Sequence, residues 1–146
     1  MDDFVVLDIE LATSATLECT FYESKEECIL KVHISGICTD GSQGEDYGAY
    51  LYEHIGLAIL KVKPLAVLID LQDLDYTYGT RILRVFQICD DIKMFDDLIL
   101  TAFVLSDKNK FGLASLLQFD VQHPEPPIYY DVERATKELW EAYDAI

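Results

Sequence analysis

The stretch from Lys63 to Asp75 reads KPLAVLIDLQDLD, and it decides the fold of this chain. Pro64 lacks a backbone N–H and cannot continue a helix, so it ends any helix before it. The run that follows, residues 65–69, is short and continuously apolar. Such a run is typical of a central strand that is covered on both faces. The stretch therefore predicts a buried strand from Leu65 to Leu71 in the interior of a sheet.

Apolar residues recur at helical spacing before and after this strand. The first set spans residues 45–61, with acids in its first turn and lysines just after its last apolar position, and the second set lies in residues 82–92. The apolar positions are Tyr47, Tyr50, Leu51, Ile55, Ala58 and Ile59 in the first set, and Ile82, Val85, Phe86, Cys89 and Ile92 in the second. We therefore predict one helix on each side of the central strand, the second packed on it.

The remaining patterns complete an α/β domain. Further strands are predicted at residues 3–10, 15–22, 28–38, 98–105 and 128–130. Ser106 is predicted to cap a short helix that carries Leu113, Leu116 and Leu117. Asp131 is predicted to cap a last helix, whose inward-facing residues are Val132, Ala135, Leu139, Ala142, Tyr143 and Ile146. Alternating strands and helices indicate parallel crossover units, whereas the early strands indicate an antiparallel portion. We expect one domain, residues 1–146, with a mixed sheet and about four helices.

The charge balance limits the classes of partner. Eleven basic against 27 acidic residues give a formal charge of -16, which repels phosphate backbones and anionic headgroups. We therefore expect neither nucleic-acid nor membrane binding, and a basic protein partner is favoured. The alternative is that the acidic surface only keeps the protein soluble. The residues after Met1 include no basic stretch of the kind that starts a secretory signal, and no apolar run approaches the roughly 20 residues that span a membrane. We therefore expect a cytoplasmic protein.

The cysteines do not form a metal-binding pattern. Cys19, Cys28, Cys38 and Cys89 include no CxxC pair and are interpreted as reduced thiols. The nearest approach to a metal set is Cys28, His33 and Cys38, but residues 28 and 33 of one strand point to opposite faces. We expect no metal and no cofactor.

No pattern of catalysis stands out either. The sequence contains no glycine-rich phosphate loop, HExxH or GxSxG motif, so we expect no enzyme. His54 falls within the first predicted helix and is interpreted as a partly buried structural histidine. The acid pairs at residues 90–91 and 96–97 are interpreted as a solvated face, with a cation site as the less favoured alternative.

The order of elements resembles the STAS domain of anti-sigma-factor antagonists and of the cytoplasmic tails of sulfate transporters. The resemblance covers residues 28–143, and three stretches carry it. These are KPLAVLIDLQDLD at residues 63–75, LKVHISG at residues 30–36 and IYYDVERA at residues 128–135. They are similar to the family's central strand, to the strand that ends at a glycine before the first helix, and to the last strand with its helix start.

The resemblance places the functional loop after the central strand, where the phosphorylated antagonists carry Asp-Ser-x-Gly. This chain has Asp75-Tyr76-Thr77-Tyr78-Gly79-Thr80 there. Gly79 matches the family glycine and Thr77 the phosphorylated serine, but Tyr76 replaces the aspartate and the segment from Asp70 is about two residues short. Thr77 is thus a candidate phosphorylation site, since a helix N-terminus favours phosphate. The alternative is that Thr77 or Thr80 only caps the second helix.

The resemblance implies a non-catalytic regulatory domain that contacts a protein, such as an anti-sigma factor or another basic protein. We expect the contact at residues 75–86, with Asp75, Tyr76, Thr77, Tyr78, Gly79 and Thr80 as partner-binding residues and Tyr76 to Thr80 exposed. The alternative for the tyrosines is core packing. Two other functions stay open: a binder of a small apolar or anionic ligand between sheet and helices, and an acidic inhibitor or immunity-type protein that blocks a basic partner.

Overall fold

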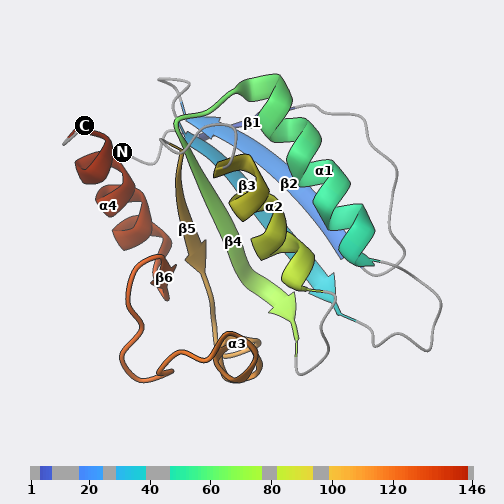
Figure 1. Cartoon of the computed structure of the whole chain (residues 1–146), viewed down its shortest axis with the longest axis vertical. Coiled ribbons are helices and arrows are strands. Elements are labelled where there is room, and N and C mark those ends of the chain that lie inside the picture. The colour runs from blue at the N-terminus through green and yellow to red at the C-terminus, as the bar shows by residue number, and fades with distance from the viewer. Residues whose placement is uncertain are drawn as a thin grey trace.

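The computed structural model describes residues 4–7, 17–24, 29–38, 47–76, 82–93 and 99–144. Six strands form one sheet in the order β1-β2-β3-β4-β5-β6 (Figure 1). The strands are β1 (Phe4–Leu7), β2 (Leu17–Ser24), β3 (Ile29–Ile37), β4 (Ala66–Asp75), β5 (Leu100–Val104) and β6 (Ile128–Tyr129). The helices are α1 (Tyr47–Val62), α2 (Leu83–Lys93), α3 (Lys110–Leu117) and α4 (Val132–Asp144). The predicted α/β class is confirmed.

The sheet is mixed, as predicted. β1, β2 and β3 pair antiparallel, whereas β3, β4, β5 and β6 pair parallel. The parallel strands follow one another across helices, because a parallel pair needs a crossover connection. All the parallel strands therefore present their carboxyl ends at the same end of the sheet, together with the start of α2 and with α3.

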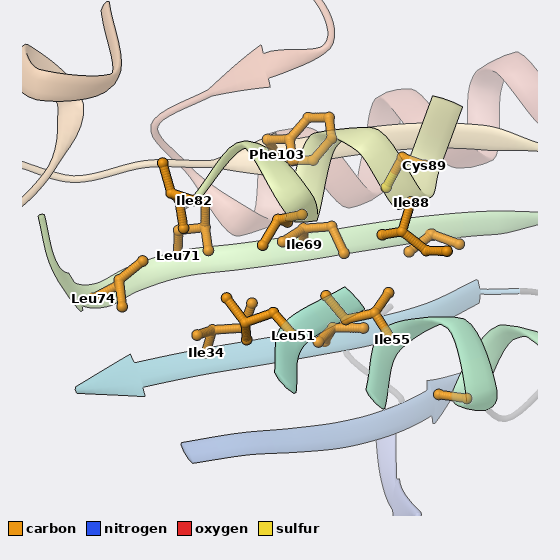
Figure 2. Packing of buried hydrophobic residues seen from close by; sticks show 14 of the residues in the cluster. Ile34, Leu51, Ile55, Ile69, Leu71, Leu74, Ile82, Ile88, Cys89 and Phe103 are labelled. Atoms are coloured by element: carbon orange, nitrogen blue, oxygen red, sulfur yellow. The ribbon is translucent and has the colours of Figure 1, made fainter. Parts of the chain in front are cut away.

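Helices cover the two faces of the sheet, and each face has its own hydrophobic cluster. α1 and α2 lie side by side over one face, and α4 packs against β4 and β5 on the other (Figure 1). Val67 and Ile69 of β4 belong to the larger cluster beneath α1 and α2, whereas Ala66 and Leu68 belong to the smaller cluster beneath α4. Figure 2 shows part of the larger cluster. The central strand is thus buried on both faces, as its apolar run predicts.

The predicted helix stripes are largely confirmed. Every stripe residue of α1 from Leu51 to Ile59 is buried, and so are Val85 and Cys89 of α2. In α4 the cap is confirmed, because the Asp131 carboxylate accepts the Glu133 amide at 3.1 Å. Ala142, however, was expected to face inward and is exposed.

Two predicted boundaries are wrong. α3 begins at Lys110, after Asn109, and Ser106 instead begins the preceding turn, in which its carbonyl accepts the Lys110 amide at 2.8 Å. β4 was expected to end at Leu71, but it continues to Asp75. The extension of β4 determines the geometry of the candidate site.

Candidate functional site at the carboxyl end of the sheet

A β-bulge near the end of β4 shifts the alternation of its side chains. Asp70 pairs with His33 and Asp73 pairs with Ser35, so two residues of β4 lie opposite the single residue between them on β3. Before the bulge, Leu71 lies in the larger cluster together with the odd-numbered residues; after it, Leu74 and Tyr76 lie there. Figure 2 shows Leu71 and Leu74 in the same cluster as Ile82. The bulge therefore turns even-numbered residues towards α1 and α2.

Side chains from the segment after β5 satisfy the backbone at the bulge. The β4–β5 ladder ends at the pair Asp70 and Val104. Beyond it, the Asn109 amide donates to the carbonyls of Leu71 at 2.5 Å and Leu74 at 2.9 Å, and Asn109 is only 1% exposed. Unpaired carbonyls at this depth would be destabilising, so Asn109 replaces the missing strand.

A second set of bonds continues the same junction. The Ser106 hydroxyl donates to the Gln72 carbonyl at 2.7 Å, and the Tyr76 amide donates to the Lys108 carbonyl at 3.2 Å. The Ser106 backbone amide in turn donates to the side-chain oxygen of Asn109 at 3.1 Å, and this bond fixes the orientation of the Asn109 side chain. Residues 105–109 and the end of β4 therefore form one hydrogen-bonded unit.

The ionisable side chains near the bulge lie on the strand face that is opposite to α1 and α2. Asp70 is buried, and its carboxylate accepts a hydrogen bond from the Gln72 amide at 3.1 Å. Burial raises the pKa of the Asp70 carboxyl above the usual value, although the bond from Gln72 and the nearby His33 each act to lower it. His33 itself contacts the Asp73 carboxylate at 2.7 Å. Asp73 and Asp75 are exposed, so this end of β4 presents carboxylates to solvent.

The structure corrects one of the predicted partner-binding residues. Tyr76 was expected to be exposed, but it is only 4% exposed and lies in the larger cluster. The reason is the bulge, which directs residue 76 inward. Asp75 is exposed as expected, and its carbonyl accepts the Cys38 amide at 2.9 Å. Residues 77–80, which hold Thr77, Tyr78, Gly79 and Thr80, lie outside the described residues.

The start of α2 and α3 extend this surface. Leu83 and Arg84 are exposed at the first turn of α2, whereas Phe86 packs against Phe103 with ring centroids 4.5 Å apart. On α3, Phe111 is 64% exposed, and the Lys110 ammonium lies 5.2 Å from its ring centroid. The exposure of Phe111 was not predicted from the sequence. It could have been, because this aromatic residue lies outside the stripe of Leu113, Leu116 and Leu117.

The polar groups of the junction are bonded to the backbone and hold the end of β4 in place. Over the ranges that the structure describes, no three metal-ligating side chains lie together, and no helix is long and apolar enough to cross a membrane. The cysteine thiol of Cys19 is packed against the larger cluster, and burial raises its pKa to about 12.

Comparison with known proteins identifies the fold. No protein-family model matches the chain, and no curated protein matches its sequence. The structure is similar to that of an anti-sigma factor antagonist from Mycobacterium paratuberculosis, with a TM-score of 0.59 and 16% identity over 89% of this chain and 99% of that one. An antisigma-factor antagonist STAS domain from Rhodobacter sphaeroides also matches, with a TM-score of 0.45 and 12% identity over 66% of this chain and 92% of that one. The first of these matches shows that the chain has the fold of an anti-sigma factor antagonist, the STAS-like fold that the resemblance predicted.

Proposed function

We propose that this chain, residues 1–146, is a single cytoplasmic, non-catalytic regulatory domain that contacts a protein partner through the segment 75–86. One observation carries the proposal. Residues 105–109 are bonded to the end of β4 through Asn109 and Ser106, so the segment that follows Tyr76 leaves from a fixed platform. Rigid support for a contact segment favours binding, because less conformational entropy is lost when the partner docks.

The contact surface consists of Asp75, residues 77–80, the first turn of α2 and Phe111. Tyr76 supports this surface from the core and does not touch the partner. An exposed aromatic ring and the exposed Leu83 supply apolar contact, which is typical of the energetic centre of an interface. Asp73 and Asp75 add negative charge, so a basic partner, such as an anti-sigma factor, is favoured.

The test is affinity capture from the native host with three variants. Leu83→Glu and Phe111→Glu each place a charge on the proposed surface, whereas Leu65→Glu places the same charge on an exposed leucine just before β4, at the opposite end of the sheet. We expect a specific protein to be captured by the parent chain and by Leu65→Glu and lost with the other two, while all melting temperatures stay similar. Equal capture by all three variants would contradict the proposed surface.

Thr77 decides between a constant contact and a regulated one. We propose that the contact does not depend on phosphorylation, because Tyr76 stands where the phosphorylated antagonists have an aspartate. Thr77→Glu is then expected to leave capture nearly unchanged, while Tyr78→Ala weakens it. A phosphate on Thr77 in protein from the host, together with loss of capture by Thr77→Glu, would instead support a phosphorylation switch.

A further inference from the structure

A second surface, on the outer side of α1 and α2, has features of a docking groove. The hollow has a volume of about 450 Å³ and is lined by Tyr52, Glu53, Gly56, Leu57 and Leu60 of α1 and by Ile88, Asp91 and Ile92 of α2. From Glu53 to Leu60 the α1 residues follow the spacing i, i+3, i+4 and i+7, so they form one stripe along the helix. The stripe lies beside the one that packs on the sheet, which includes Leu51, Ile55 and Ala58.

The groove exposes large apolar side chains to water. Leu57 is 52% exposed and Leu60 is 71% exposed, one turn apart on the same helix. Single exposed leucines are common on protein surfaces, but two that flank an apolar hollow indicate a site that another surface covers. Two neighbouring helices leave between them a groove into which the side chains of a third helix fit.

The two helices that form the groove are held at a fixed spacing. The Tyr52 hydroxyl on α1 donates to the Asp91 carboxylate on α2 at 2.5 Å, and the Arg84 guanidinium lies 5.4 Å from the Tyr52 ring centroid. At Gly56 the helices approach so closely that a Cβ atom would lie 3.3 Å from Cδ1 of Ile88. The groove therefore exists before any partner arrives, and binding does not have to open it.

The charged residues that line the groove select the partner. Glu53 and Asp91 are both acidic, one on each helix, in a chain with a formal charge of -16. A second copy of this chain would bring the same carboxylates against each other, and a membrane surface would present anionic headgroups to them. Both are therefore disfavoured by repulsion. A partner with basic side chains around an apolar stripe satisfies both the leucines and the carboxylates.

We propose that the groove between α1 and α2 binds a basic amphipathic helix of a protein partner. Leucine-sized anchors of that helix lie against Leu57, Leu60 and Ile92, and its lysine or arginine residues approach Glu53 and Asp91. This surface adjoins the proposed contact at residues 75–86, but none of the residues that line the groove belongs to that contact. The inference therefore does not depend on the proposed function.

The experiment measures the affinity of a defined probe. The probe is a fluorescent synthetic peptide of about 18 residues, or five helical turns, with leucines at helical spacing and lysines elsewhere. A scrambled peptide of identical composition carries the same charge without an apolar face. Fluorescence anisotropy gives the Kd of each peptide for the parent chain, for Leu57→Glu/Leu60→Glu and for a control double variant, Val6→Glu/Leu65→Glu, whose two positions lie outside both proposed surfaces. Both double variants add the same negative charge at exposed positions.

The proposal predicts a clear order of affinities. The amphipathic peptide should bind the parent chain about tenfold or more tightly than the scrambled one, and the groove variant should lose about tenfold or more of that affinity. The control variant should bind as tightly as the parent chain or more tightly, because its added charge lies elsewhere. Backbone amide NMR shifts during titration of the parent chain should concentrate in α1 and α2.

Other results would overturn the proposal. Equal binding of the two peptides, or equal affinity of both double variants, would mean that charge alone attracts the peptide. A dimer of the parent chain in sedimentation velocity that dissociates in Leu57→Glu/Leu60→Glu would mean that a second copy covers the groove. NMR shifts confined to α3 and β4 would place the peptide outside the groove.

Discussion

Removal of the Asn109 side chain should detach the end of β4 from the segment after β5. In Asn109→Ala, the carbonyls of Leu71 and Leu74 lose donors at 2.5 Å and 2.9 Å, in a region where Asn109 itself is 1% exposed. A buried acceptor left without a donor costs about 1–3 kcal/mol, so two of them should lower the free energy of unfolding by about 2–6 kcal/mol. Urea unfolding measures this loss as a lower midpoint with little change in slope.

Two variants make this prediction specific. Asn109→Asp keeps the shape of the side chain but replaces the donor with a carboxylate that faces two carbonyl oxygens, so it should destabilise at least as much as Asn109→Ala. Ser106→Ala removes one bond to the Gln72 carbonyl at a partly exposed site and should cost about 1 kcal/mol. A loss below about 0.5 kcal/mol for Asn109→Ala would refute the argument that this amide replaces a strand.

Three further predictions concern β4 and the helix packed on it. In urea unfolding, Val67→Ala should lower the free energy of unfolding by about 1.5–2 kcal/mol and Phe86→Ala by about 2–4 kcal/mol. Losses below about 0.5 kcal/mol at both positions would contradict the packing of α2 on the sheet. Tyr76→Ala should cost about 3 kcal/mol or more, because the ring lies in the larger cluster; an unchanged melting temperature would mean that the ring is exposed after all. Because burial raises the pKa of Asp70, the protonated carboxyl stabilises the folded state below the ordinary carboxyl pKa, and this stabilisation is lost as pH rises through the folded pKa. Asp70→Asn should therefore gain stability relative to the parent chain as pH rises above the ordinary carboxyl pKa of about 4 in urea titrations, and a constant difference would refute this.

Local sequence was sufficient to predict most of the fold. The apolar run at residues 65–69 can be buried only in a strand covered on both faces, and the helix stripes are set by a period of 3.6 residues. These signals lie within one element, so no knowledge of distant residues is needed. The mixed sheet then follows from the order of the elements and from the chirality of parallel crossovers.

The bulge in β4 could not be predicted in the same way. Its carbonyls are satisfied by Asn109, which is 38 residues away from Leu71 in the sequence, so no local pattern marks the extra residue. Tyr76 was predicted to be exposed because residues 75–80 were expected to form a loop after the central strand, whereas β4 continues to Asp75 and its bulge directs Tyr76 into the larger cluster. The groove between α1 and α2 did leave a signal, because residues 55–60 read IGLAIL and contain more apolar side chains than one helix face can bury.

The bonds from Asn109 and Ser106 also affect the solubility of the protein. Past Asp70, β4 has no strand beside it on the β5 side, and an uncovered strand of this kind is a template for pairing with another chain. Because these two side chains occupy the carbonyls of Leu71, Gln72 and Leu74, an incoming strand finds no free acceptors there. The same contacts that shape the carboxyl end of the sheet thereby protect an interior strand from aggregation.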